Sequence, residues 1–358
     1  MSPGALAARV ALWVYQRLRA CVDRLAPPEL LLADHITGVT GTVVTGALVA
    51  SGLVERLDET PRSVRELAGG GTLDVDTAER ILRGAAALGL LERSGAGFRR
   101  NRLTRALQPD SPRGLGPVAV YFASELNLLT WCRFLEALRS GVVPFRHAHG
   151  RGVWEQLALS EEDRVCFARA MDALTRLDAE AVVRTPGFSG VAGLCDVAGG
   201  TGALLEAALR AHPALEGVLV DAPSVVQLAR PRFERAGLLG RVRLEAADVF
   251  ASVPEGLPAY VLKDVLHDWD DARALVLLQA VRRAMPPGGR LLLVELLLEK
   301  GPVASLASRV DLQMLAITDG GRQRSVDQLA ALLGKAGFGR PVVHRTRTAS
   351  SVLVAEAV

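Results

Sequence analysis

The sequence predicts an α/β fold, with a doubly wound sheet in the second half of the chain and a mainly helical first half. From residue 188 onward, short apolar runs alternate with stretches of helical periodicity, as expected for parallel strands joined by helices. A glycine-rich turn follows the first of these runs, and polar residues follow five consecutive runs. We therefore predict two domains, a helical one at 1–187 and the sheet domain at 188–358.

The glycine-rich turn closes the stretch 191–202, in which an apolar run leads to Asp196 and a helical stretch follows at 203–211. The small residues of the turn are Ala198, Gly199, Gly200 and Gly202. Glycines let a ligand approach the backbone, and the start of a helix offers free N–H groups. The turn contains neither Gly-Lys-Ser/Thr nor Gly-x-Gly-x-x-Gly. Its pattern Asp-x-Ala-Gly-Gly-x-Gly is closer to the turn that holds the methionine part of S-adenosylmethionine (SAM); a purely structural turn is the alternative.

Seven apolar runs of this half are predicted strands, at 192–197, 217–221, 242–246, 259–265, 290–297, 342–345 and 351–355. Ligands of open α/β sheets bind beyond the carboxyl ends of the strands. Polar residues stand at these ends, namely Asp196, Asp221, Asp248, His267, Asp268 and Glu295. A single one has a local explanation, since Asp221 also suits a helix cap and Asp248 a turn. Five such ends in succession predict a binding edge.

Several residues of this edge have the spacing of a nucleoside site. Asp221 lies about 20 residues beyond the glycine turn, the distance at which a carboxylate bonds the two ribose hydroxyls. Asp248 is expected to accept from an adenine amino group, and Val249 or Phe250 to cover the ring face. Lys263 stands on an apolar strand in a chain with only three lysines, so we expect it to hold a ligand oxygen.

His267 follows the fourth run and precedes a stretch in which Asp270 or Asp271 is expected to cap the next helix. With an ordinary imidazole pKa of about 6.5, its neutral form is available as a base at pH 7. Glu295, one strand along, is placed to orient the ring and to stabilise the imidazolium. The alternative is a histidine that bonds a backbone carbonyl.

Composition narrows the class of function. The 358 residues carry a net charge of only +3, which gives no electrostatic case for nucleic acid or an anionic membrane as partner. Four cysteines fit neither a disulfide framework nor zinc spacing, and arginines interrupt any signal-peptide core near the N-terminus. We therefore expect a cytoplasmic protein. Residues 36–54 are uncharged, but their Thr, Ser and Gly content argues against a membrane span.

The first half is predicted to be helical around a small winged-helix arrangement. Its predicted elements are helices at 5–25, from 30 to beyond 35, at 45–56 and at 77–90, and a hairpin around 94–97. Ser63 and Glu66 have capping-box spacing, and Asp76 is expected to open the helix at 77–90. That helix is largely Ala and Leu, so docking of a second subunit is favoured over DNA binding.

A predicted loop at 144–154 contains His147 and His149. This spacing suits a metal ion, but one pair without further ligands is more often part of a packed or solvated loop, so no metal site is predicted. The helix that follows carries Phe167 and Met171 at helical spacing, for which core packing is the default interpretation.

Blocks along nearly the whole chain match one family pattern. The most specific is Val261-Leu-Lys-Asp-Val-Leu-His-Asp-Trp-Asp-Asp. Others are Asp196-Val-Ala-Gly-Gly-Thr-Gly, Val220-Asp221-Ala-Pro, Ala247-Asp248-Val-Phe-Ala-Ser-Val-Pro, Pro287-Gly-Gly, Val294-Glu295, Asp311-Leu-Gln-Met-Leu, Gly320-Gly-Arg-Gln-Arg-Ser, His149-Gly150 with Val153-Trp154, and Phe167-Ala-Arg-Ala-Met171. In these blocks the chain closely resembles the plant-type O-methyltransferase family, including its bacterial antibiotic-tailoring members.

The resemblance implies a Rossmann-like methyltransferase domain preceded by a winged-helix-like dimerisation domain, in a homodimer whose N-terminal domains interlock. It implies SAM as methyl donor, S-adenosylhomocysteine (SAH) as product and a small aromatic molecule as acceptor. It implies that His267 takes the proton of a phenolic or enolic hydroxyl, flanked by Glu295 and a second carboxylate. The acceptor contacts it implies are Phe167, Met171, Asp268, Asp311 and Met314.

Two positions depart from the family pattern. Ala198 replaces the first glycine of the turn, a small change that still admits the methionine part. Gln323 replaces the second flanking carboxylate, and an amide orients an imidazole without neutralising its charge. Gln323 keeps a second hypothesis open, in which SAM serves decarboxylation, hydroxylation or a pericyclic step without methyl transfer. A winged-helix DNA-binding regulator is a third hypothesis, which the apolar second helix disfavours.

Overall fold

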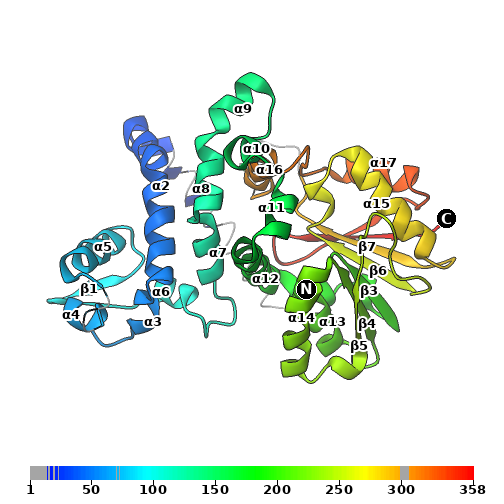
Figure 1. Cartoon of the computed structure of the whole chain (residues 1–358), viewed down its shortest axis with the longest axis horizontal. Coiled ribbons are helices and arrows are strands. Elements are labelled where there is room, and N and C mark those ends of the chain that lie inside the picture. Colours follow the sequence, from blue (N-terminus) through cyan, green and yellow to red (C-terminus); the bar gives the residue numbers. More distant parts are fainter. Residues whose placement is uncertain are drawn as a thin grey trace. The chain divides into compact units, whose positions relative to one another are not determined.

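The computed structural model describes residues 14, 17–18, 21–22, 24–69, 71, 73–298 and 306–358 (Figure 1). The chain divides into two compact units, Met1–Glu125 and Leu126–Val358. Helices 126–183 thus belong to the unit that contains the sheet, and the functional boundary at 187/188 stays a prediction.

The first unit consists of short helices and one hairpin: α2 (Pro28–Ala50), α3 (Leu53–Arg56), α4 (Val64–Leu67), α5 (Val75–Ala87), β1 (Glu92–Ser94), β2 (Gly97–Arg99), α6 (Arg102–Leu107) and α7 (Gly116–Phe122). The predicted capping box of Ser63 and Glu66 opens α4, and the predicted hairpin is β1–β2. Leu48, Leu82 and Phe98 meet in the core of this unit. The helix–turn–helix–hairpin arrangement expected from the sequence is therefore present.

The second unit alternates helices and strands after an all-helical start. Its helices are α8 (Glu125–Cys132), α9 (Phe134–Ser140), α10 (Pro144–His149), α11 (Val153–Leu159), α12 (Glu161–Val183), α13 (Ala203–Ala211), α14 (Pro223–Ala236), α15 (Asp271–Ala284), α16 (Leu306–Ile317) and α17 (Val326–Lys335), with single turns η1 (Pro186–Phe188), η2 (Leu239–Arg241) and η3 (Leu266–Asp268). Its strands are β3 (Gly193–Val197), β4 (Glu216–Asp221), β5 (Val242–Ala246), β6 (Ala259–Lys263), β7 (Arg290–Glu295), β8 (Val342–Arg345) and β9 (Ser351–Glu356).

These seven strands form one sheet in the order β5-β4-β3-β6-β7-β9-β8. Strands β3 to β7 are parallel, whereas β9 pairs antiparallel with both β7 and β8. The chain winds outward from β3 to β5 on one side and from β6 to β7 on the other, so the winding reverses between β3 and β6. The predicted doubly wound α/β fold and all seven predicted strands are confirmed.

Helices cover both faces of the sheet (Figure 1). Side chains alternate between the faces, so Leu194 packs with α12, α13 and α14 while its neighbour Cys195 packs with α15 and α17. Both faces are buried, which explains why the strands read as continuous apolar runs. The carboxyl ends of β3 and β6 meet at the point where the winding reverses, which is where such sheets bind ligands.

Three local predictions need correction. The predicted helix that starts at residue 30 and the first half of the one predicted at 45–56 form a single helix, α2, because the Thr and Gly residues between them keep helical geometry. Residues 53–56 form a separate helix, α3. Helix α5 begins at Val75 because Asp74, not Asp76, accepts the hydrogen bond that caps it. The predicted loop at 144–154 begins instead with α10, which Pro144 opens at its first position. The predicted helix at 5–25 lies mostly outside the described residues.

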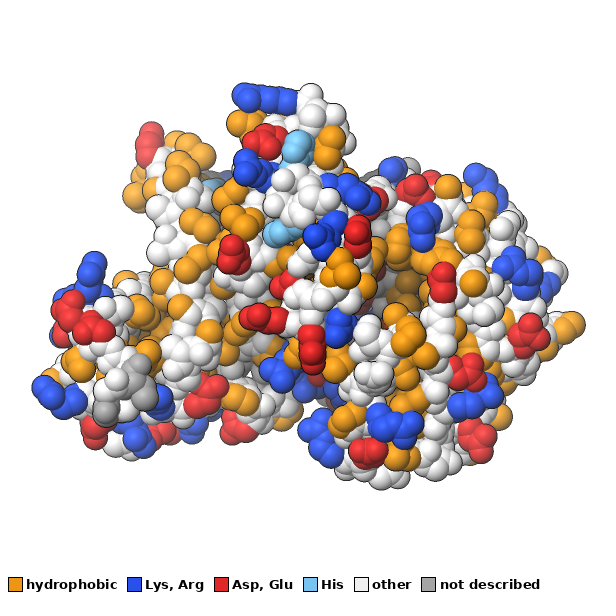
Figure 2. Space-filling model, in the orientation of Figure 1, with side chains coloured by type: hydrophobic (Ala, Val, Ile, Leu, Met, Phe, Trp, Pro, Cys, Tyr) orange, Lys and Arg blue, Asp and Glu red, His pale blue; other side chains and the backbone are white. Residues whose placement is uncertain are grey.

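Helix α2 carries an exposed apolar face (Figure 2). Its exposed large apolar side chains are Leu30, Leu32, Ile36, Val39 and Val43. In the described ranges, α2 is the one helix that is long and apolar enough to cross a membrane, and only 11 % of its most apolar window is buried. One such helix near an N-terminus is weak evidence for a membrane span, and an interface between protein chains accounts for the same face.

Candidate active site

The turn between β3 and α13 is tightly packed on one side and open on the other. A Cβ atom on Gly199 would lie 2.7 Å from Cγ of Asp196, and one on Gly202 would lie 2.6 Å from a ring carbon of Phe233, so both positions require glycine. Beside Gly200 nothing lies within 4 Å of the corresponding position. Ala198 adopts φ = 54°, a left-handed conformation that costs an L residue about 1–2 kcal/mol. The first family glycine is thus replaced at the expense of backbone strain.

Asp196 lies beneath this turn and is 1 % exposed. Its Oδ2 atom is buried without a hydrogen-bond partner. Burial of the carboxyl, together with the nearby charge of Asp221, raises the pKa of Asp196 to about 7. A buried carboxylate oxygen without a donor is costly, and the ammonium group of a methionine moiety would satisfy it. Asp196 therefore fits the binding of SAM.

Asp221 fixes the shape of the same turn from the end of β4. Its two carboxylate oxygens accept from Gly200 N at 2.8 Å and from Ala222 N at 2.7 Å. Each oxygen keeps a further lone pair for a ribose hydroxyl. The predicted ribose contact is thus compatible with the structure and stays a prediction.

A row of aromatic rings crosses the edge beside the predicted adenine position. Phe167 contacts Trp154 edge-on with ring centroids 6.0 Å apart, Trp154 stacks on Trp269 at 5.6 Å, and Trp269 meets Phe250 at 4.8 Å. The Arg273 guanidinium lies over the rings of Phe250 and Trp269, at 4.4 and 4.7 Å from their centroids. The row joins a residue predicted to contact the acceptor to one predicted to cover the adenine ring.

The remaining residues predicted to contact the adenine lie in the turn after β5. Oδ1 of Asp248 accepts from Phe250 N at 3.0 Å, so this exposed side chain also acts as the turn residue that the sequence allowed. Val249 is half-buried against the apolar core between the sheet and helices α15 and α17. These positions remain predicted cofactor contacts.

Lys263, whose expected contact with a ligand oxygen stays a prediction, is held by two carboxylates of the protein. Its ammonium group contacts Asp264 and lies 3.5 Å from Oδ1 of Asp178 on α12, and its side chain is 6 % exposed. Asp178 in turn accepts a hydrogen bond from Ser350. These two carboxylates account for the buried charge of Lys263, so the structure supplies a reason for this lysine that needs no ligand oxygen.

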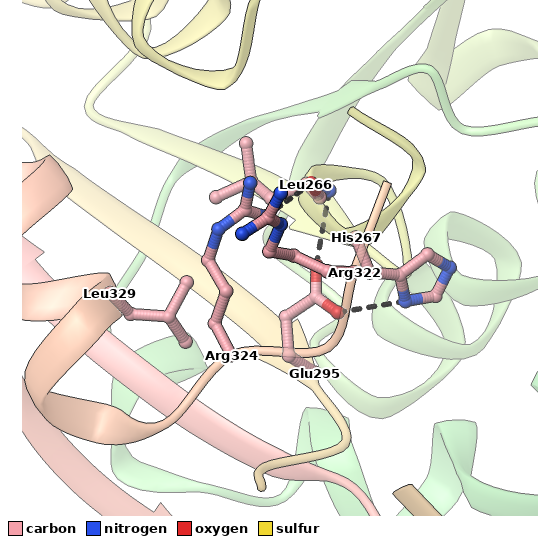
Figure 3. A pocket seen from close by; sticks show the side chains of 6 residues that line it. All are labelled: Leu266, His267, Glu295, Arg322, Arg324 and Leu329. Carbon is pink, nitrogen blue, oxygen red and sulfur yellow. Dashed lines mark hydrogen bonds and ion pairs between the residues drawn. The ribbon is translucent and has the colours of Figure 1, made fainter. Parts of the chain in front are cut away.

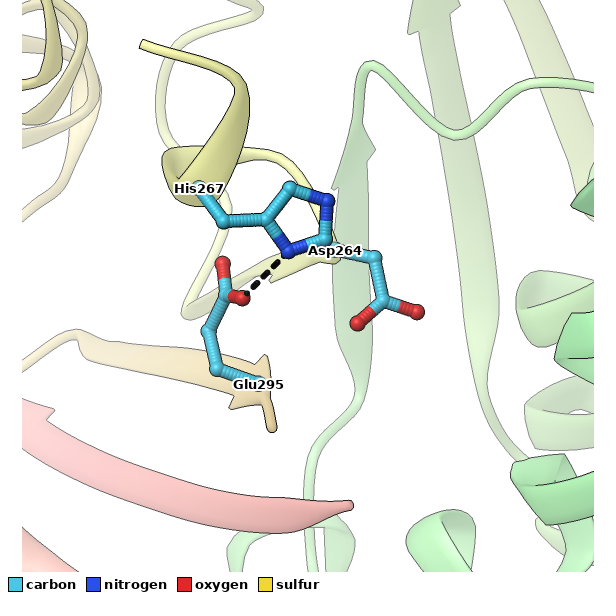
Figure 4. Close-up of side chains that lie close together, drawn as sticks. All are labelled: Asp264, His267 and Glu295. Atoms are coloured by element: carbon cyan, nitrogen blue, oxygen red, sulfur yellow. Dashed lines mark hydrogen bonds and ion pairs between the residues drawn. The ribbon is translucent and has the colours of Figure 1, made fainter. Parts of the chain in front are cut away.

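His267 lies in η3 at the end of the central strands, and its side chain is 11 % exposed. Its Nδ1 atom lies 3.0 Å from Oε2 of Glu295 (Figure 4). The other Glu295 oxygen accepts from Leu266 N at 3.1 Å, so the carboxylate fixes both the turn and the ring. In the neutral ring, a proton held on Nδ1 by Glu295 leaves the lone pair on Nε2. Nε2 is therefore the basic atom, 3.5 Å from Oδ1 of Asp268.

The charges around His267 favour its protonated form. Burial alone lowers the pKa of an imidazole, but the negative charges of Glu295 and Asp268 outweigh this and raise the pKa of His267 to about 10. Burial raises the pKa of Asp268 to about 7 despite the opposing charge of His267. The sequence analysis placed Glu295 beside the ring but expected an ordinary imidazole, neutral at pH 7, and so did not foresee this rise in the pKa of His267. In the free protein the ring must lose a proton before it acts as a base.

Gln323 occupies the second flanking position beside the ring. Its side-chain nitrogen lies 3.0 Å from Nδ1 of His267, and its Oε1 is buried without a partner. An amide can present either its NH₂ or its oxygen, so it accommodates both tautomers of the ring but adds no charge. Gln323 N donates to Oδ1 of Asp311 at 2.7 Å. Asp311, predicted to contact the acceptor, therefore also anchors the segment that carries Gln323.

Arg324 also holds the histidine turn in place, a role that sequence reasoning missed. The side chain is buried, and it donates to Leu266 O and Trp269 O, both at 2.7 Å, and to Asp271 at 2.9 Å. Figure 3 shows Arg324 together with Leu266, His267, Glu295, Arg322 and Leu329, which line one small pocket. The only sequence signal was its place next to Gln323, because 58 residues separate Arg324 from Leu266.

The predicted acceptor residues come from two helices and from η3. Phe167 and Met171 are half-buried on α12, and Met314 is 6 % exposed on α16. Asp268 stands directly beside the imidazole. Which of them touch an acceptor stays a prediction.

Among the described residues, one group of three side chains has spacing that suits a metal ion. Asp264, His267 and Glu295 each bring a ligand-type atom to within 4.8 Å of the others. Hydrogen bonds from Leu266 and His267 occupy Glu295, and Lys263 neutralises Asp264, so contacts within the protein account for this cluster.

The two histidines of α10 bond separate partners. Nε2 of His147 lies 3.1 Å from Ser140 Oγ, and Nε2 of His149 lies 2.9 Å from Leu126 O. His147 is exposed and His149 is half-buried, and the two rings share no common partner in these contacts.

Known proteins share this fold and sequence over nearly the whole chain. A model of the O-methyltransferase domain matches residues 131–339. The mitomycin biosynthesis 6-O-methyltransferase of Streptomyces lavendulae is 33 % identical over 87 % of this chain and 90 % of its own length. The structure of LaPhzM is 30 % identical with a TM-score of 0.89 and covers 93 % of this chain and 100 % of its own. The structure of the O-methyltransferase NcsB1, in complex with SAM and 2-hydroxy-5-methyl naphthoic acid, is 26 % identical with a TM-score of 0.75 and covers 89 % and 96 %.

The O-methyltransferase domain match spans the residues of this edge, so the sheet and its glycine turn are those of a SAM-dependent methyltransferase. The chain belongs to the plant-type O-methyltransferase family, whose bacterial members tailor natural products. It is a SAM-dependent O-methyltransferase of secondary metabolites, with a small molecule as substrate and SAH as product. The sequence-based assignment of family and activity is confirmed.

Proposed function

We propose that this enzyme methylates a phenolic or enolic hydroxyl of an aromatic secondary metabolite and that His267 is its general base. The observation that carries the proposal is the bond between Glu295 and Nδ1 of His267, which leaves Nε2 as the basic atom. The hydroxyaromatic acid bound to the related NcsB1 and the mitomycin relative support an aromatic acceptor. Bound SAM supplies an electrophilic methyl group.

The residues of this chain then have separate tasks. Nε2 of His267 takes the hydroxyl proton, Glu295 stabilises the imidazolium that results, and Arg324 keeps the turn between them in place. The proposed acceptor contacts Phe167, Met171, Met314 and Asp268 orient the ring, with Asp311 holding Gln323. The proposed cofactor contacts are the glycine turn, Asp196, Asp221 and the stretch from Asp248 to Phe250.

Replacing His267 with Ala tests the base. We expect kcat to fall about 10²–10⁴-fold with phenols of ordinary acidity, because a positioned base contributes about that much. The loss should shrink for nitro-substituted phenols, which are already ionised at neutral pH. His344→Ala, on the edge strand β8, serves as the matched histidine control. Turnover by His267→Ala equal to that of the wild type on an unactivated phenol would remove the proposed role.

A second function is favoured only by Gln323, whose amide replaces a flanking carboxylate. In that case SAM is bound but its methyl group is not transferred. Mass spectrometry separates the two, because methylation adds the mass of one methylene group and releases SAH. An acceptor that is converted without either change would support the second function.

We also propose a homodimer in the cytoplasm. The exposed apolar side chains of α2 support a second copy of the chain as the partner of that helix. Light scattering on the purified protein measures the mass directly. A monomer at micromolar concentration would count against the dimer, as would recovery of the protein only with detergent.

A further inference from the structure

The glycine turn is tied to α12 by one side chain of its own. Oγ1 of Thr201 donates to Oδ1 of Asp172 at 2.9 Å. Thr201 stands between Gly200 and Gly202, both of which have positive φ, of 60° and 81°. Glycines constrain the backbone least of all residues, so a contact made by the threonine between them restricts the turn more than it would elsewhere.

Asp172 is itself held by charge. The Arg232 guanidinium of α14 contacts the same Oδ1 atom, and Arg176 of α12 lies 3.3 Å from Oδ2. Arg232 also donates to Glu206 of α13 at 2.7 Å. Asp172 is 11 % exposed and Arg232 is 17 % exposed, so solvent screens this network less than it screens a surface pair. Three helices thus fix the carboxylate that Thr201 contacts.

The position of this carboxylate links two parts of the site. Asp172 directly follows Met171, a proposed acceptor contact on α12, whereas Thr201 lies within the proposed cofactor turn. On the opposite side of the turn, Asp221 accepts from Gly200 N. The turn is therefore held from β4 through Asp221 and from α12 through Asp172.

We propose that Asp172 is a positioning residue, which holds the turn in its SAM-binding shape through Thr201 and ties that shape to the helix that carries Met171. The inference rests on the proposed placement of SAM at this turn. When the bond is removed, the Gly-Thr-Gly segment regains conformational freedom, and binding of the cofactor must then order it. Affinity for the cofactor should fall without any change in a group that touches it.

Calorimetric titration with SAH, supported by melting temperatures, tests the inference. Thr201→Val, which keeps the shape and loses the hydroxyl, should raise the Kd for SAH about fivefold, whereas Thr201→Ser should stay within about twofold of the wild type. Asp172→Ala, which removes the acceptor, should weaken binding by at least as much. The double variant Asp172→Ala/Thr201→Val should bind no more weakly than the weaker single variant, because both remove the same contact.

Two controls separate positioning from stability. Glu206→Gln weakens the anchor of Arg232 but leaves the Thr201 bond. It should therefore lower the melting temperature while the Kd for SAH stays close to that of the wild type. Glu180→Gln, in an exposed ion pair on α12, should change neither. Unchanged SAH affinity in Thr201→Val, or additive losses in the double variant, would overturn the inference. If the wild-type protein failed to bind SAH, the proposed function would fall first and this inference with it.

Discussion

The two buried carboxylates of the sheet edge, Asp196 and Glu295, differ in how far the protein itself satisfies them. At the ends of β3 and β4, Asp196 keeps a buried oxygen without a partner and Ala198 holds a strained conformation. At the ends of β6 and β7, Glu295 already bonds both His267 and the backbone of η3. Asp196 is thus incomplete without a ligand, while the Glu295–His267 pair is organised in its absence. The β6 and β7 side of the edge is not free of cost, because Oε1 of Gln323 is buried there without a partner and Asp264 adopts φ = 53°. Ligand affinity should therefore depend on the unsatisfied groups, and catalytic geometry on the satisfied ones.

The largest effect should come from Asp196→Asn, at the incompletely satisfied carboxylate. Losing one partner of a buried charge pair costs about 2–5 kcal/mol, so the Kd for SAH should rise about 30-fold or more. The stability of the ligand-free protein, in contrast, should increase in the variant. The pKa of Asp196 is raised in the folded state, so its ionisation makes folding less favourable as pH rises from about 4 to about 7. At pH 8 the melting temperature of ligand-free Asp196→Asn should therefore exceed that of the wild type.

Melting curves at pH 5 and pH 8, with and without SAH, measure both effects. The gain in the free protein should be larger at pH 8, where the wild-type carboxylate is ionised, and SAH should stabilise the wild type more than the variant. A variant that loses stability at pH 8 and keeps its SAH affinity would show that Asp196 is a structural residue and would remove the contrast between the two carboxylates.

Glu295→Gln tests the Glu295–His267 pair through the pH dependence of kcat/KM. Because the charge of Glu295 helps to raise the pKa of His267, the fraction of neutral base in the wild type grows as pH rises towards about 10 and is lost as pH falls. The variant should shift the rising limb of kcat/KM to lower pH by about one pH unit or more. Its plateau should be lower, by about tenfold, since the imidazolium formed in the reaction loses its partner. An unshifted profile would exclude His267 as the titrating base.

The sequence predicted which residues lie at the binding edge better than it predicted their contacts and pKa values. Strand ends and the glycine turn have local signals, so Asp196, Asp221, His267 and Glu295 could all be placed from spacing alone. Arg324 and Asp172 could not, because their partners are 58 and 29 residues away and neither contact leaves a periodic signal. The raised pKa of His267 was missed for a related reason, since it depends on burial and on three carboxylates that converge only in the folded chain.

Gln323→Glu measures the effect of a second carboxylate beside the His267 imidazole. Its charge should stabilise imidazolium further, which makes the neutral base rarer at pH 7 but lowers the barrier once the base is neutral. We expect about threefold slower turnover at pH 7 and a similar gain on the alkaline plateau. The sign should therefore reverse within one pH profile. A uniform change at every pH would mean that Gln323 acts on the acceptor rather than on His267.

The smallest effect should come from Ala198→Gly, which restores the family glycine and removes the left-handed alanine. Relief of strain is worth about 1–2 kcal/mol, but glycine gains freedom in the unfolded chain that offsets about 0.4–1 kcal/mol of it. The free energy of unfolding should rise by about 0.5–1 kcal/mol in urea, with little change in the Kd for SAH. A control at Ala207, within helix α13, should lose stability on the same change, since glycine is unfavourable inside a helix. If Ala198→Gly instead tightened SAH binding several-fold, the strained alanine would be shown to oppose cofactor binding rather than only folding.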